Sequence, residues 1–486
     1  MKKTFILLLT VMISLQISFA QKSSTTWPMN GLVRVYFMQP PDYTFANNGN
    51  DAALLTNCVF DTFAAYINRA KYTIDIAQYE YRTYSGDPIY TAINNAYSRG
   101  VKIRYIDDYG ETSSGDNTGV AHLNSSIPVL TSPNPGTTPP CGGSCTIMHN
   151  KFVVIDENSP DTTNAFVLTG SLDWDVEMNT GDYNNAIILQ SKELAFAFTH
   201  EFDIMWGDTL HGGAYNDTTS LFGPCKPNSG QHIFNIGGSE VELYFSPSDG
   251  VNNEILKTIS TASSDLYCGM FTFTEDADAD SIVAHKNKGA FAAAILDHYS
   301  SGSDYPYTNI LPTGLGSDFV GYVNNYYVYH NKYLIVNPSS PSNDPKVLTG
   351  SHNWTSSANY SNDENTVIVH NDTVANFYLQ AFAGDFKAIS GKPLGINEIS
   401  PVDGDVYIYP NPAEEGSPVY LNVNSLLNLS NAKLVIYDLL GNKLTEIDHL
   451  TSQHNVIDCR IQANGMYFFQ LFNDGKPVKT GKFLYQ

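Results

Sequence analysis

An internal repeat is the feature that most constrains what this chain can fold into. Three short motifs occur twice in the same order, at residues 33–37 and 241–245, 149–156 and 330–337, and 169–174 and 349–354. Between these motifs, stretches with helical periodicity alternate with short apolar runs. The sequence therefore predicts a layered α/β unit that is present in two copies.

The composition of the chain changes at two further points. Residues 211–239 are rich in Gly, Asn, Ser and Pro, which is typical of a linker or excursion. We therefore expect the first repeat at residues 31–210 and the second at residues 240–392. From residue 405 to residue 486, short runs of alternating apolar residues replace the helical periodicity. This pattern predicts a small all-β, Ig-like sandwich domain.

Residues 1–20 have the pattern of a secretory signal peptide. Lys2 and Lys3 precede an apolar stretch at residues 5–17, and a small-x-small cleavage site ends at Ala20. The apolar stretch is shorter than the ~20 residues that a membrane-spanning helix needs. No later segment is long and apolar enough to span a membrane, so we expect an exported protein without a transmembrane segment.

Export permits disulfide bonds among the six cysteines. Cys141 and Cys145 enclose a short Gly-Gly-Ser loop that suits a local disulfide, but six cysteines can pair in many ways. No second pair of Cys or His stands at zinc-ligand spacing, and the HExxH motif is absent. We therefore expect neither a metal ion nor another cofactor.

The two His-x-Lys motifs carry the groups that phosphoryl transfer needs. Side chains alternate along a strand, so His149 and Lys151 point to one face, as do His330 and Lys332. If the two copies face each other, two imidazoles and two ammonium groups meet in one cleft. One histidine can attack phosphorus while the other protonates the leaving oxygen and later activates water. The lysines can stabilise the phosphoryl oxygens without a metal ion.

These paired H-x-K-x4-D and G-S-x-N patterns resemble those of the phospholipase D superfamily, over roughly residues 31–390. The resemblance implies an α/β fold of two α/β/α/β sandwich repeats with a shared active site at their pseudo-twofold interface. In this chain the small all-β domain follows them. The resemblance also implies a pseudo-dimeric monomer, a phosphohistidine intermediate and no metal.

Carried over by position, the resemblance assigns roles to ten residues. The expected catalytic residues are His149, His330, Lys151, Lys332, Asp156 and Glu364, and the expected phosphate-binding residues are Ser171, Ser351, Asn353 and Asp173. Glu364 matches a carboxylate that supports a histidine in family members, and we expect it to support His330. Family precedent nevertheless favours the first-copy histidine, so we predict that His149 is the nucleophile.

Three positions depart from the family pattern. Asn337 replaces the Asp of the second motif, although the tyrosyl-DNA phosphodiesterase branch also has Asn there. Asp173 replaces an Asn and places a carboxylate beside the expected phosphate site. Asn184 stands at the first-copy position equivalent to Glu364, and an amide stabilises an imidazolium less than a carboxylate does. A noncatalytic protein that keeps the fold is therefore a further interpretation.

The C-terminal residues resemble the sorting domains of the type IX secretion system of Bacteroidetes. The matching motifs lie at residues 409–412, 438–443, 465–467 and 481–482. The resemblance implies the type IX machinery as a partner, passage across both the inner and outer membranes, and a secreted or cell-surface protein. An ordinary Ig-like binding module is the alternative interpretation.

Net charge separates the two substrate classes of the superfamily. The chain has 49 acidic and 26 basic residues, a formal net charge of −23, and such a protein repels a polyanion such as nucleic acid. A zwitterionic phospholipid head group meets no such barrier. We therefore predict a phospholipase D-like hydrolase that cleaves head groups from phospholipids to leave phosphatidate. A secreted nuclease is the alternative, and a noncatalytic surface-binding protein is the third possibility.

Overall fold

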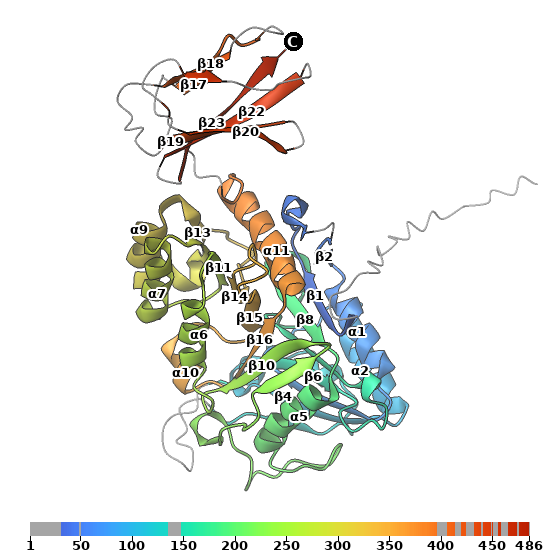
Figure 1. Ribbon diagram of the computed structural model, residues 1–486. Coiled ribbons are helices and arrows are strands. Elements are labelled where there is room, and N and C mark those ends of the chain that lie inside the picture. Colours follow the sequence, from blue (N-terminus) through green and yellow to red (C-terminus); the bar gives the residue numbers. More distant parts are fainter. Residues whose placement is uncertain are drawn as a thin grey trace, which may run out of the picture. The chain divides into compact units, whose positions relative to one another are not determined.

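The chain divides into two compact units, residues 1–391 and residues 392–486 (Figure 1). The computed structural model describes residues 31–47, 50–134, 147–395, 406–413, 419–423, 432–438, 441–448, 450, 455–457, 465–473 and 476–485. The signal segment expected at residues 1–20 lies outside the described residues, as do Cys141 and Cys145. The finer domain boundaries stay predictions.

The first repeat is an eight-stranded mixed sheet with the order β2-β1-β8-β7-β6-β3-β4-β5. β3, β4 and β5 run parallel, whereas β6, β7, β8 and β1 are antiparallel neighbours. The strands are β1 (Val33–Phe37), β2 (Ala53–Leu54), β3 (Thr73–Gln78), β4 (Lys102–Asp107), β5 (Val129–Thr131), β6 (Lys151–Ile155), β7 (Phe166–Gly170) and β8 (Asn185–Leu189). The helices are α1 (Val59–Arg69), α2 (Pro88–Ser98), α3 (Tyr109–Ser114), α4 (Val176–Thr180) and α5 (Lys192–Trp206).

The second repeat has an eight-stranded sheet with the order β13-β12-β11-β14-β15-β16-β10-β9. The strands are β9 (Ile233–Ile236), β10 (Ser239–Ser246), β11 (Asp265–Met270), β12 (Phe291–Asp297), β13 (Phe319–Tyr322), β14 (Lys332–Val336), β15 (Lys346–Gly350) and β16 (Glu364–His370). The helices are α6 (Val251–Ser260), α7 (Asp276–Asn287), α8 (His298–Ser301), α9 (Leu311–Leu315), α10 (Ser356–Tyr360) and α11 (Asp372–Ser390). From β10 to β13, the seven strands of this sheet correspond one for one to the seven strands of the first sheet from β1 to β5. This correspondence confirms the duplicated α/β fold.

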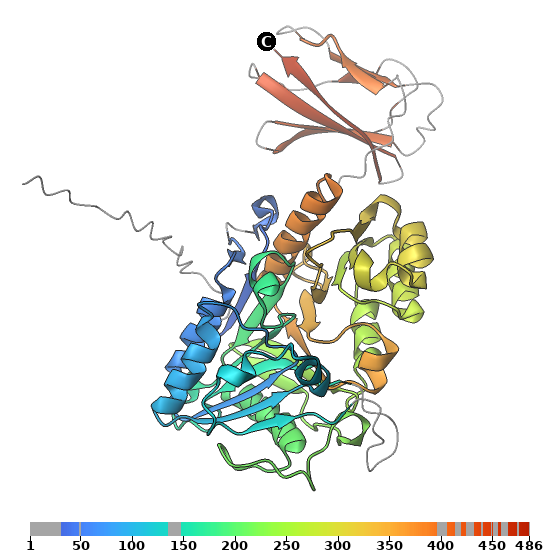
Figure 2. The same ribbon diagram turned by 180° about the vertical axis from the view of Figure 1, so that it is seen from behind.

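Local sequence explains why these elements form. Along α1, the buried residues Val59, Phe63 and Ile67 recur at helical spacing and pack on one face of the first sheet. α2 begins after Asp87, whose carboxylate accepts a hydrogen bond from the Ile89 N–H, and Pro88 occupies its first position. α1 and α2 therefore cover the outer face of the first sheet, as the view from behind also shows (Figure 2).

The two repeats meet through equivalent aromatic contacts. The ring centroid of Phe37 on β1 lies 5.0 Å from that of Tyr378 on α11. The ring centroid of Phe245 on β10 lies 5.2 Å from that of Phe198 on α5. Phe37 and Phe245 end the same repeated motif, so each repeat packs its first motif against the last helix of the other repeat. This exchange is the pseudo-twofold arrangement that the family resemblance implies.

The segment at residues 211–239 is more ordered than the expected linker. β9 pairs with β10 and extends the second sheet, and the Lys226 ammonium is buried between the carboxylates of Glu201 and Asp363. Cys225 next to it forms a disulfide, whereas Cys58 and Cys268 are free thiols. The excursion is therefore tied to both repeats.

The C-terminal unit is all-β, as the alternating apolar runs predict. One sheet has the order β17-β18-β21 and the other the order β20-β19-β22-β23, and apolar residues of both sheets form one buried core. The strands are β17 (Val406–Tyr409), β18 (Val419–Val423), β19 (Ala432–Tyr437), β20 (Lys443–Asp448), β21 (Asn455–Ile457), β22 (Gly465–Asn473) and β23 (Lys476–Tyr485). Among the described residues of the whole chain, no helix has the length and apolar character needed to cross a membrane.

Candidate active site

His149 stands two residues before the start of β6 and is held by the second repeat. Its backbone N–H donates to the Asp363 carbonyl at 2.9 Å, and its Nδ1 lies 2.7 Å from Glu364 Oε2. The Ser351 hydroxyl donates to the same carboxylate oxygen at 2.7 Å. All three side chains are buried. In the neutral imidazole the Nδ1 proton is therefore directed at Glu364, which leaves the Nε2 lone pair available for attack.

The expectation that Glu364 supports His330 of its own copy is wrong. Glu364 is the first residue of β16, and the segment before that strand pairs with the segment before β6 through a bridge between Met148 and Asp363. The start of β16 therefore lies beside the histidine of the opposite repeat. The carboxylate supports His149.

His330 stands two residues before the start of β14 and has the equivalent environment with a neutral partner. Its Nδ1 lies 3.2 Å from Asn184 Oδ1, and the Ser171 hydroxyl donates to that same oxygen at 2.7 Å. On the other side of the ring, Lys332 Nζ lies 3.0 Å from His330 Nε2. The ring therefore directs its Nδ1 proton at Asn184 while its Nε2 accepts a hydrogen bond from Lys332.

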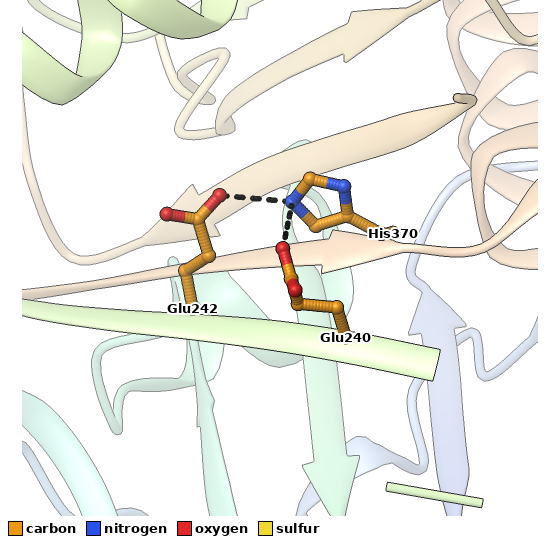
Figure 3. Close-up of side chains that lie close together, drawn as sticks. All are labelled: Glu240, Glu242 and His370. Atoms are coloured by element: carbon orange, nitrogen blue, oxygen red, sulfur yellow. Dashed lines mark hydrogen bonds and ion pairs between the residues drawn. The ribbon is translucent and has the colours of Figure 1, made fainter. Parts of the chain in front are cut away.

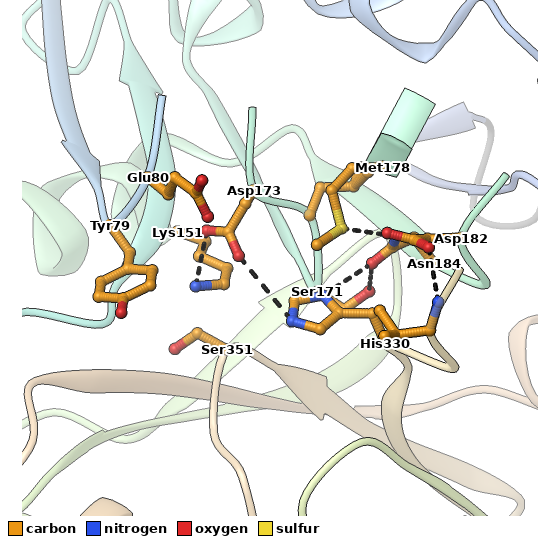
Figure 4. Close-up of polar contacts among 12 residues, drawn as sticks. Tyr79, Glu80, Lys151, Ser171, Asp173, Met178, Asp182, Asn184, His330 and Ser351 are labelled. Atoms are coloured by element: carbon orange, nitrogen blue, oxygen red, sulfur yellow. Dashed lines mark hydrogen bonds and ion pairs between the residues drawn. The ribbon is translucent and has the colours of Figure 1, made fainter. Parts of the chain in front are cut away.

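Asp173 joins the two halves of the cluster. One carboxylate oxygen lies 2.9 Å from Lys151 Nζ and the other lies 3.9 Å from His330 Nε2, as Figure 4 shows. The Lys151 ammonium also lies 4.6 Å from the ring centroid of Tyr79. An anionic group therefore already lies between the lysine of one repeat and the histidine of the other.

Burial and like charge set the protonation states of this cluster. Burial is the largest cause that lowers the pKa of His149 well below its ordinary value, and the Lys151 charge adds to it. Burial and the Lys332 charge lower the pKa of His330 in the same way. Burial raises the pKa of Glu364 to about 7. Both imidazoles are therefore neutral near neutral pH, as a nucleophile and a general base must be.

Two predicted site residues, Asn353 and Asp156, have their described hydrogen bonds with backbone N–H groups and not with the histidines. Asn353 is half-buried, and its Oδ1 accepts a hydrogen bond from the Thr272 N–H at 3.3 Å. Asp156 follows β6, which places it about 16 Å along the strand from Lys151. Its carboxylate accepts hydrogen bonds from the backbone N–H groups of residues 71–73. The expectation that Asp156 is catalytic is therefore wrong, because the strand carries it away from the histidines and it stabilises a turn.

Asn337 explains why Asp and Asn are interchangeable at that motif position. It follows β14, has a positive φ of 55° like Asp156 at 54°, and accepts hydrogen bonds from the N–H groups of Ser263 and Ser264. An amide oxygen accepts these bonds as well as a carboxylate does. This departure from the family pattern therefore leaves the active-site cluster untouched.

A pair of asparagines cross-links the two repeats. The Asn185 amide donates to Asn331 Oδ1 at 3.0 Å, and the Asn365 amide donates to the Thr169 hydroxyl at 2.7 Å. Sequence reasoning missed both residues. The signal was present, because Asn185 and Asn365 each follow the glycine of the Gly-Ser turn by the same number of residues.

The fold and this doubled cluster define a phosphodiesterase-like protein of two repeats. The family description "Cardiolipin synthase, PLD-like domain" matches residues 63–206 and 255–386, more than half of the chain. The chain therefore belongs to the PLD-like family. The description "Secretion system C-terminal sorting domain" matches residues 407–486, which indicates type IX export to the cell surface or outside.

Curated relatives match about one repeat's length of this chain. A mitochondrial cardiolipin hydrolase of Xenopus tropicalis is 27% identical over 173 residues, 36% of this chain and 70% of the relative. A phospholipase D of Rickettsia bellii is 24% identical over 149 residues, 31% of this chain and 70% of the relative. Among solved structures, the phosphatidylserine synthase of Haemophilus influenzae is 13% identical with a TM-score of 0.49, and the match covers 74% of this chain and 86% of the synthase.

Proposed function

We propose that this protein is an exported phosphodiesterase that works through a phosphohistidine on His149. The observation that carries the proposal is the pairing of neutral, buried His149 with the Glu364 carboxylate, opposite a second buried imidazole that contacts a lysine. One ring is arranged to attack and to become an imidazolium. The other is arranged to exchange a proton.

In the first step, His149 Nε2 attacks phosphorus and the bond from phosphorus to the leaving oxygen breaks. The Nδ1–H donates to Glu364, which stabilises the positive charge that develops on the ring. The leaving oxygen takes its proton from Nε2 of protonated His330. The negative phosphodiester favours that protonated form, and Lys332 Nζ lies 3.0 Å from the ring nitrogen to supply the proton.

In the second step, water attacks the phosphohistidine from the side of the departed group. His330 Nε2, neutral after the first step, accepts a proton from that water. The bond from phosphorus to His149 Nε2 breaks, which restores the free imidazole and releases the phosphomonoester. Lys151 stabilises the phosphoryl oxygens in both steps. His330 returns the proton from water to Lys332, which restores the starting charges.

We propose phospholipids as the substrate, cleaved to phosphatidate and a free head group. Acidic side chains lie beside the cluster: Asp173 belongs to it, and burial together with Asp173 raises the pKa of Glu80 to about 8. With the net charge of −23, the Asp173 carboxylate opposes a polyanion more than a zwitterionic head group, whereas Glu80 is largely protonated near neutral pH and adds little charge. Relatives named as a phospholipase D and a cardiolipin hydrolase support the same choice.

The experiment offers purified protein phosphatidylcholine, phosphatidylethanolamine and cardiolipin vesicles and, separately, plasmid DNA, all in excess chelator. We expect phosphatidate from the vesicles, no turnover by His149→Asn or His330→Asn, and full turnover by the exposed control His122→Asn. Nicking of DNA without lipid cleavage would instead support the nuclease. No turnover of either substrate would support the noncatalytic interpretation.

A further inference from the structure

A second polar cluster lies at the far end of β16, away from the histidine pair. Glu240 and Glu242 lie two residues apart on β10, and His370 ends the neighbouring strand β16. His370 Nε2 lies 2.9 Å from Glu242 Oε1 and 3.8 Å from Glu240 Oε1, as Figure 3 shows. Among the described residues, these three are the group whose potential ligand atoms all lie within 4.8 Å of one another.

Neighbouring side chains orient the two inner members of this cluster. Asp344 Oδ1 lies 2.9 Å from His370 Nδ1 and accepts a hydrogen bond from it. In the metal-free protein Nε2 donates to Glu242 Oε1, and loss of that proton would free its lone pair for a metal ion between the two glutamates. The Tyr244 hydroxyl donates to Glu242 Oε2, which leaves Oε1 directed toward His370. In protein metal sites, a ligating histidine commonly donates its other N–H to a carboxylate, and a ligating carboxylate accepts a further hydrogen bond. His370 and Glu242 have these interactions with Asp344 and Tyr244.

The two separations measured from His370 Nε2 fit a small divalent ion. Ligand bonds of 2.0–2.1 Å at a tetrahedral zinc ion place neighbouring ligand atoms about 3.3 Å apart, and the two observed separations of 2.9 and 3.8 Å lie on either side of that value. A single proton on Nε2 can bridge to only one oxygen at a time, whereas a metal ion engages all three atoms. The Glu240 side chain is half exposed, so a water molecule can reach the fourth position.

We propose that Glu240, Glu242 and His370 bind one zinc ion that links β10 to β16. One imidazole with two carboxylates suits zinc better than calcium or magnesium, which prefer oxygen ligands alone. His370 lies six residues along β16 from Glu364, about 20 Å away. The ion is therefore structural, and the proposal does not depend on the proposed hydrolysis.

The test is equilibrium dialysis of metal-free full-length protein against zinc chloride, with bound zinc measured by atomic spectroscopy. We expect one zinc per chain and a higher melting temperature with zinc. His370→Asn and Glu242→Gln should each weaken binding at least about tenfold, and the surface variants His122→Asn and Glu193→Gln should bind as the unaltered chain does. Phosphodiesterase turnover below the melting temperature should be the same with and without zinc.

Three results would overturn the proposal. They are the absence of stoichiometric zinc binding, equal binding by a folded His370→Asn variant, and equal affinity for calcium. Circular dichroism establishes that each variant is folded before its affinity is compared. A failure of hydrolysis in the vesicle assay would leave the zinc stoichiometry unaffected, so the two proposals fail independently.

Discussion

Replacing Glu364 by Gln tests the pairing on which the catalytic assignment depends. The carboxylate lies 2.7 Å from His149 Nδ1 and is fully buried. Gln keeps the size and the hydrogen bond from Ser351 but removes the charge that stabilises the imidazolium. Its amide can also donate to Nδ1, which would move the proton to Nε2 and block the attacking lone pair.

The expected loss can be worked from this contact. A hydrogen bond to a charged group contributes up to about 3 kcal/mol, and losing that amount in the transition state lowers kcat about 150-fold. If the amide also reverses the tautomer, the loss rises toward about 10⁴-fold, as for the equivalent change in a serine protease triad. Asn184→Asp is the matched control, because it alters the partner of His330 at the equivalent position, and we expect its kcat to change less than about tenfold.

The pH profile supplies a second readout. Because burial raises the pKa of Glu364 to about 7, the carboxylate becomes neutral as the pH falls through that value, and kcat of the unaltered protein should fall with it. The Gln variant should lack this acidic limb. Head-group release from vesicles between pH 5 and 9 measures both effects. A Gln variant with kcat within about threefold of the unaltered protein and the same profile would refute the pairing.

Three further substitutions have definite expected outcomes. Asp173→Asn removes a competing anion from Lys151, so KM and the inhibition constant of inorganic phosphate should fall about fivefold; unchanged constants would contradict this. Lys226→Met leaves Glu201 buried without its cation, so urea denaturation should show a loss of about 3–5 kcal/mol, and a loss below about 1 kcal/mol would refute the buried pairing. Asp278 is buried and, among the described residues, its carboxylate has no hydrogen-bond partner. Burial raises its pKa from 3.8 to about 7, so its stabilising contribution is complete below about pH 4 and is lost as the pH rises to about 7. Asp278→Asn should therefore be more stable than the unaltered protein by up to about 4 kcal/mol at pH 8 and unchanged at pH 4; equal stability at both values would contradict it.

The sequence predicts most of the fold because its signals are local. Apolar runs and helical periodicity define the strands and helices, and the repeated motifs predict that both sheets have the same strand order, as they do. The His-x-Lys alternation correctly predicts that His330 and Lys332 share a face, since their nitrogens lie 3.0 Å apart. The ordered excursion was harder to predict, because Lys226 is buried by residues far from it in the sequence.

Some site residues were predicted correctly and others were not, because their roles depend on contacts with residues far away in the sequence. Asp156 belongs to the motif in sequence but lies at the opposite end of β6, where its carboxylate accepts hydrogen bonds from backbone N–H groups. Position within a motif does not separate a residue that touches the reacting group from one that holds the strand. Asn185 and Asn365 show the converse case, because each contacts a residue of the other repeat.

The sequence by itself determined the duplication, the histidines and lysines, and the C-terminal sorting domain, since each depends on motifs within a short stretch of chain. Only the tertiary structure decided which histidine has the carboxylate. Glu364 crosses the pseudo-twofold axis to His149, and Asn184 crosses it to His330. The physical reason is that each repeat packs the strand of its first motif against the last helix of the other, and the segment before β6 pairs with the segment before β16, so each imidazole takes its partner from the opposite repeat.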